Sequence, residues 1–265
     1  MMHSVFTKTL YEKRWFIVGW TFGFTALAAL MASFYPAMHQ DGAIDALVQN
    51  MPKAFEGLIG DLANLRDFPA YMASQLFDIR LPLIAGIMAI ILGQGLSTAE
   101  EESGELRTIT SLPISRTRVL IEKWLAMCTI TLITTIGLVV GTYAVLPFLD
   151  DANLQIGSFM RLVAFTWLLM VTYGTITFAA GMVLGKKSVA TFVGTFVIIG
   201  SFILTTFGQV VDWLADWEKL SLLYYFPAVD VMKNGVDWTN VLVLGIISIV
   251  CLSAAIIVFR RRDIS

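Results

Sequence analysis

The chain has 265 residues, of which 57% are hydrophobic and only 14% carry a charged side chain. Charged residues make up about a quarter of a typical soluble domain, so this composition cannot cover a water-facing surface and predicts a polytopic membrane protein. The formal net charge of -2 provides no basic face for a phosphate backbone, which argues against nucleic-acid binding.

The residues before the first apolar run predict a short amphipathic helix. Its apolar stripe and its polar face are formed by Val5, Phe6, Thr9 and Leu10 and by Lys8, Glu12 and Lys13, respectively. A helix of this kind lies along a membrane surface, so we expect an N-terminal elbow at the inner leaflet.

Six apolar segments are long enough to cross about 30 Å of hydrocarbon as helices, whereas a β-barrel would show alternating segments of about ten residues. The predicted spans cover residues 15–35, 81–99, 124–148, 162–184, 188–211 and 241–259, with outer loops at 36–80 and 212–240. No repeat or linker divides the chain. We therefore expect a single all-α transmembrane domain over residues 1–265.

The distribution of Lys and Arg predicts the orientation of these spans. With the N-terminus in the cytoplasm, twelve of the 18 Lys and Arg residues fall on the cytoplasmic side and six fall outside. Cytoplasmic loops carry the excess of positive charge in membrane proteins, so the pattern predicts that both termini are cytoplasmic.

The two long outer loops have patterns of their own. Apolar positions at helical spacing between residues 55 and 65 predict a small amphipathic helix. Aromatic residues between 213 and 238, among them Trp213, Trp217, Phe226 and Trp238, favour anchoring at the lipid headgroups over a substrate gate.

The interiors of the predicted spans contain no Asp, Glu, Lys, Arg or His. Their absence argues against a proton-coupled carrier and less firmly against a sodium-coupled one, since hydroxyls and carbonyls can bind sodium. Gln94, Gln209 and many threonines supply the polarity that remains. Threonine is also common packing glue between membrane helices, so both interpretations of these residues stay open.

No catalytic, metal or nucleotide site is predicted within the chain. The segment 181–188 imitates a phosphate loop, but it has three residues between its glycines and a second Lys before its Ser. No HExxH pair occurs, and both cysteines, Cys128 and Cys251, lie inside apolar runs. We therefore expect a non-catalytic chain with no cofactor or nucleotide-binding domain of its own.

The connection between the second and third spans holds the most informative pattern. Leu106, Ile109 and Leu112 share one side of a helix, Pro113 ends that helix, and Ser115 is placed to cap the next one at Arg116. An amphipathic helix outside the lipid lies in the interface or docks in a partner's groove. Acidic residues at 100–102 disfavour anionic headgroups, so the pattern favours a partner protein.

This connection resembles that of the membrane subunits of ABC-2 type exporters. Those proteins carry an acidic run, a Gly, an apolar residue and a Leu-Pro-Ile-Ser-Arg-like turn after the second span, matched here by Glu100 to Glu102, Gly104, Leu106 and Leu112-Pro113-Ile114-Ser115-Arg116. Many also end in a Phe-x-Arg-Arg-Asp-like tail, matched by residues 259–263. Arg107 and Thr108 depart from the acid and Leu often found there.

The resemblance implies a permease of the cell membrane, surrounded by lipids, that pairs with a second permease, identical or related. Two separate ATP-binding subunits would bind ATP and Mg. The residues implied in coupling to the ATPase, as a cytoplasmic coupling helix and its flanks, are Glu100, Glu101, Glu102, Gly104, Leu106, Ile109, Leu112, Pro113 and Arg116. The second and fifth spans would face each other across the two permeases and line a path with Gln94, Thr195, Phe202 and Gln209.

Spans that are rich in Thr but free of charge suit an amphipathic cargo better than a bare ion, which needs charges or many dipoles to replace its solvation. Two other functions remain open from the sequence. The chain could be a scaffold or sensor that regulates a partner without transport, or, less in keeping with the pattern, an ion-driven carrier.

Overall fold

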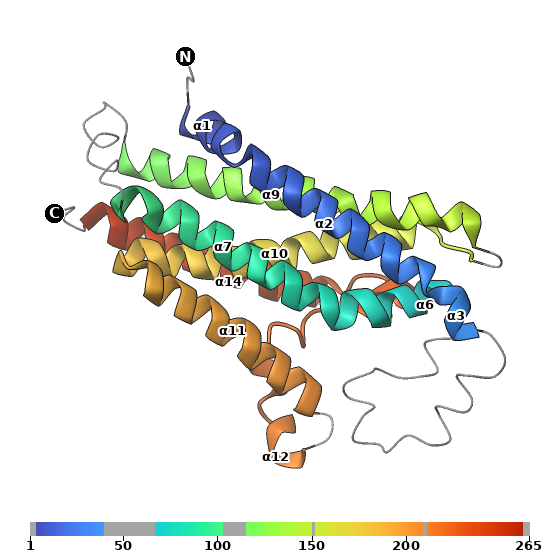
Figure 1. Ribbon diagram of the computed structural model, residues 1–265. Helices are drawn as coiled ribbons and strands as arrows, with labels where there is room; N and C mark the ends of the chain where they lie inside the picture. The colour runs from blue at the N-terminus through green and yellow to red at the C-terminus, as the bar shows by residue number, and fades with distance from the viewer. Residues whose placement is uncertain (1–3, 40–66, 103–114, 150–151, 209–210, 262–265) are drawn as a thin grey trace.

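The computed structural model describes residues 4–39, 67–102, 115–149, 152–208 and 211–261, and all regular structure in these residues is helical (Figure 1). Six helical segments are long and apolar enough to cross a membrane. They are Arg14–Ala37, Phe68–Thr98, Arg116–Phe148, Ile156–Leu184, Lys187–Gly208 and Trp238–Arg261. The predicted all-α fold with six spans is therefore confirmed.

The elements follow one another along the chain with short connections. In order, they are α1 (Val5–Glu12), α2 (Arg14–Ser33), α3 (Tyr35–His39), α6 (Phe68–Met72), the π-helix η3 (Ala73–Asp78), α7 (Arg80–Glu102), α9 (Arg116–Val145), the 3₁₀-helix η4 (Leu146–Phe148), α10 (Ile156–Leu184), α11 (Lys187–Gly208), α12 (Asp212–Ala215), the 3₁₀-helix η5 (Glu218–Leu220), α13 (Ala228–Asn234) and α14 (Trp238–Arg261).

The helices extend beyond the predicted spans, most clearly at the start of the second segment. Helical structure begins there at Phe68, whereas the predicted span begins at residue 81. The charges that interrupt the apolar pattern have partners in the fold: the Asp78 carboxylate accepts a hydrogen bond from the Ala228 N–H. Arg80 donates to the carbonyl and to the side-chain oxygen of Gln75, the latter at 2.9 Å. Charge therefore ends the predicted span here, whereas in the fold the π-helix η3 meets α7 and the helical segment continues.

α10 lies at the centre of the bundle and has the longest series of buried residues, from Phe159 to Met182. It packs against α7, α9, α11, α13 and α14, while α2 packs along α9. α10 ends at Gly185, whose positive φ of 64° closes the helix in the left-handed conformation and turns the chain into α11. This arrangement makes α10 and α11 a tight hairpin.

Small residues allow the closest helix contacts. A side chain at Gly137 or Gly141 of α9 would collide with the carbonyl oxygens of Thr21 and Thr25 on α2, respectively. A Cβ at Gly93 of α7 would lie 2.6 Å from the Gly174 carbonyl oxygen on α10. Backbones that approach this closely gain van der Waals contact, which drives helix association in lipid.

α2, α11 and α14 form the least buried part of the bundle. Among their exposed apolar side chains are Phe22, Phe192 and Ile249, which are 73%, 68% and 65% exposed. These surfaces are available to lipid or to another subunit.

The aromatic residues between α11 and α14 do not share one environment. Trp213, Trp217 and Trp238 are exposed, as expected for headgroup anchors. Phe226 differs from that expectation: it is buried and its ring centroid lies 5.2 Å from that of Phe165 on α10. The amphipathic helix expected between residues 55 and 65 lies outside the described residues.

Candidate functional site

Both termini lie at the same end of the bundle, which we call the α1 end (Figure 1, left). α7 ends and α9 begins there, on either side of residues 103–114. Ser115 is the N-cap of α9, and its Oγ accepts a hydrogen bond of 3.3 Å from the Arg118 N–H. The predicted cap and the predicted helix start at Arg116 are confirmed.

The residues implied in coupling to an ATPase are placed only in part. Glu100, Glu101 and Glu102 form the last residues of α7, and Arg116 opens α9. Gly104, Leu106, Ile109, Leu112 and Pro113 lie outside the described residues. The coupling helix itself therefore stays a prediction, although the helices on both sides of it are placed.

Glu122 of α9 connects this helix to α1. Its Oε2 accepts a hydrogen bond of 3.1 Å from the Phe6 N–H, and its Oε1 accepts one of 2.8 Å from Arg118 Nε. Ser4 caps the same end of α1 by accepting from the Thr7 N–H at 3.2 Å. The expected N-terminal helix is present, and α9 holds its first turn; its position relative to a membrane stays a prediction.

Lys123, the next residue of α9, connects this helix to α7. Its side chain is buried, with 2% exposure, and Nζ donates a hydrogen bond of 3.1 Å to the Leu96 carbonyl oxygen. Lys13 approaches the same part of α7, since its Nζ lies 3.5 Å from where a Cβ of Gly95 would be. Two lysines from different segments therefore meet α7 at adjacent residues.

Sequence reasoning counted Lys123 among the cytoplasmic charges and missed its burial. The signal that was available is its position: Ser115 starts the helix, so Lys123 lies two turns inside it and directly before the apolar run that begins at Trp124. An ionisable residue at such a place needs a hydrogen-bonding partner. Ionisable residues inside membrane helices often mark functional sites.

The four path residues predicted from the second and fifth spans do not form one cluster. Gln94 of α7 accepts a hydrogen bond from Thr191 of α11, so it joins two helices of one chain. Thr195 is half-buried beside a hollow, Phe202 packs against the apolar core, and Gln209 lies outside the described residues.

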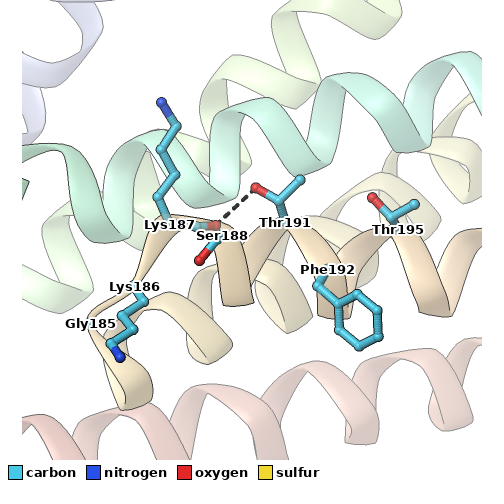
Figure 2. Close-up of a pocket in the computed structure, with 7 residues that line it drawn as sticks. All are labelled: Gly185, Lys186, Lys187, Ser188, Thr191, Phe192 and Thr195. Carbon is cyan, nitrogen blue, oxygen red and sulfur yellow. Dashed lines mark hydrogen bonds between the residues drawn. The ribbon is translucent and has the colours of Figure 1, made fainter.

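The hollow next to Thr195 opens along the first three turns of α11 (Figure 2). It has a volume of about 840 Å³ and is lined by Gly185, Lys186, Lys187, Ser188, Thr191, Phe192 and Thr195. Lys186 and Lys187 extend in opposite directions, so they do not converge on one anion (Figure 2). Hydroxyls and an aromatic ring in one open hollow suit the body of an amphipathic molecule.

Most of the buried threonines donate a hydrogen bond to another group of the bundle. Thr131, Thr166 and Thr177 each donate to a carbonyl oxygen four residues earlier in the same helix. Others connect helices: Trp124 Nε1 donates to Thr175 Oγ1 at 2.9 Å, and Ser248 Oγ donates to Thr172 Oγ1 at 3.1 Å. These hydroxyls are occupied within the bundle, which favours the packing interpretation for them.

The part of the chain that the structure describes holds no group of three His, Cys, Asp or Glu residues that could bind a metal ion. The comparison with protein families gives one match of nearly full length: the model described as an ABC-2 family transporter protein matches residues 14–264. No curated protein matches the chain.

Proposed function

Because the chain belongs to the ABC-2 family of transporter proteins, we propose that it exports an amphipathic cargo across the cell membrane with energy from a separate ATPase. Membership makes it a non-catalytic, multi-pass membrane component of an ABC transporter. We propose in addition that transport is outward, that the cargo is amphipathic and that transport is coupled to ATP.

The proposed assembly has two permeases, identical or related, and two ATPase subunits that bind ATP and Mg. The excess of Lys and Arg puts the α1 end in the cytoplasm, where the ATPases would dock on residues 103–114. The family match is the observation that carries this proposal, and the hydrogen bond between Lys123 Nζ and the Leu96 carbonyl oxygen supports the coupling step. This hydrogen bond joins α7 and α9, the helices on either side of residues 103–114. A displacement of that segment by the ATPase would therefore act on both spans together.

The proposed cargo follows from the chemistry of α7 and α11. Gln94 and Thr191 bond to each other, and Ser188, Thr191, Phe192 and Thr195 line the hollow. Hydroxyls and a phenyl ring bind an amphiphile through weak polar and apolar contacts. A bare ion would lose solvation that these groups do not replace.

The test is transport by the assembled complex. The chain is purified from its native membrane with the ATPase and second permease that accompany it, and the complex is placed in proteoliposomes with ATP. We expect ATP-dependent movement of lipid-like or drug-like probes, and none with an ATPase variant that binds ATP without hydrolysing it. Accumulation of a small inorganic ion, with amphiphiles ignored, would contradict the proposed cargo; transport without any ATPase would contradict the proposed energy source.

A further inference from the structure

Two adjacent residues of α9 hold two different helices at the α1 end. Glu122 accepts from the Phe6 N–H of α1, and Lys123 donates to the Leu96 carbonyl oxygen of α7. Neighbouring residues of a helix point about 100° apart, so this pair reaches to two sides of α9. The two contacts occur at the same level of α9, two turns after its N-cap.

The burial of the Lys123 ammonium group restricts how α7 can move against α9. A buried ammonium group without hydrogen-bond acceptors is strongly unfavourable, so a side chain with 2% exposure must keep its partners. The Leu96 carbonyl oxygen is one of these partners, and it belongs to the backbone of α7. A sliding or tilting movement of α7 against α9 would break that bond while Lys123 remained buried.

α7 is also held by its other neighbours at this level. A side chain at Gly181 of α10 would collide with Ser97 Oγ, so the Ser97 side chain of α7 packs directly on α10 at Gly181. Lys13, between α1 and α2, approaches α7 at Gly95. Residues 95–98 of α7 are therefore contacted by α9, α10 and the α1–α2 connection.

We propose that Glu122 and Lys123 are positioning residues that make the ends of α1, α7 and α9 move as one body. In terms of the function proposed above, on which this part of the inference rests, a displacement of the segment between α7 and α9 is passed to α1 through Glu122 and to the bundle through Lys123. Without the pair, α1 and the end of α7 would each be free to move relative to α9.

The first experiment uses the chain alone in lipid nanodiscs and measures backbone amide hydrogen exchange. Lys123→Met keeps the length of the side chain but removes the donor, and Glu122→Gln removes the acceptor charge at α1. If the ends form one body, each variant speeds exchange by about fivefold or more in both α1 and the last two turns of α7. Lys219→Met, at an exposed lysine of η5, is the matched control and should change neither segment.

The cross effect distinguishes the proposal from two local contacts. Faster exchange in α7 alone for Lys123→Met, and in α1 alone for Glu122→Gln, would overturn it. Lys123→Arg keeps the charge and the donors, so we expect it to restore slow exchange. A general loss of protection in all six spans of Lys123→Met, not rescued by Arg, would also count against a positioning role.

The second experiment adds the partner ATPase and compares the nucleotide-free and ATP-bound complexes. We expect the ATP-dependent change of exchange in α1 to be lost in Lys123→Met and kept in Lys219→Met, while the ATPase still copurifies. An unchanged ATP response of α1 in Lys123→Met would overturn transmission through the pair. A wild-type complex without any ATP response would contradict the proposed function, while the exchange of the chain alone still decides whether the ends form one body.

Discussion

At the scale of single residues, the absence of a side chain at Gly141 decides how closely α2 and α9 pack. A Cβ at this position would collide with the Thr25 carbonyl oxygen and touch the Ala28 side chain. The colliding atom belongs to the backbone, so no rotamer change relieves the contact. Gly245 of α14 offers the contrast, because nothing lies within 4 Å of its Cβ position.

Gly141→Val should therefore destabilise the chain, while Gly245→Val should not. Overpacking of a tight contact costs about 1–3 kcal/mol, because α2 must move away from α9 along several turns. Thermal unfolding of the purified chain, followed by the loss of monodisperse protein in detergent, measures the difference. Equal midpoints for the two variants would mean that the α2–α9 contact contributes little to stability.

At the scale of elements, the number of spans was predictable from the sequence but their ends were not. Continuous apolar runs identify helices in lipid because the backbone must satisfy its own hydrogen bonds there. Asp78 and Arg80 fall in the predicted outer loop 36–80, although both belong to helical elements, whereas Glu122 and Lys123 lie in the helix that was predicted to start at Arg116. Their partners, such as the Phe6 N–H and the Leu96 carbonyl oxygen, are distant in sequence and give no local pattern.

The same limit applies to the candidate site. Ser115 was predictable as an N-cap because a cap depends on neighbouring residues, and the structure confirms it. Gln94 was predictable as a polar residue inside the second span, but its hydrogen bond with Thr191 depends on the packing of α7 against α11. Burial of Lys123 depends on the packing of α9 against α7 and was missed for the same reason.

The segment between α7 and α9 allows a direct test of ATPase docking. Ile109→Glu places a charge on the predicted apolar side, which would bury it unpaired at a partner interface at a cost of a few kcal/mol. We expect loss of ATPase copurification or of ATP-driven transport without unfolding of the spans. Thr108→Glu puts the same charge on another side of the predicted helix and serves as the control. Full assembly and transport of Ile109→Glu would place the docking surface elsewhere.

At the scale of the whole molecule, α10 separates two exposed residues that report the orientation of the chain. Asn153 precedes α10 and Ser188 follows it, and both side chains are exposed. Since α10 crosses the membrane, these residues lie on opposite sides. The excess of Lys and Arg at the α1 end predicts that Ser188 lies in the cytoplasm.

Single cysteines at these two positions should therefore react differently in intact cells. In a chain whose Cys128 and Cys251 have been replaced, Asn153→Cys should react with a membrane-impermeant thiol reagent and Ser188→Cys should not. Both should react after the cells are opened, which controls for accessibility. Labelling of Ser188→Cys alone in intact cells would reverse the orientation and move the proposed docking surface outside.

The unequal lengths of the helices make the shape of the bundle depend on the lipid around it. α9 has 30 residues and α11 has 22, which correspond to about 45 Å and 33 Å along their axes. A hydrocarbon layer of about 30 Å leaves α11 nearly upright, whereas α9 must tilt or project beyond it. Longer acyl chains cover more of α9 and leave α11 too short, so the two helices respond in opposite ways to the thickness of the bilayer.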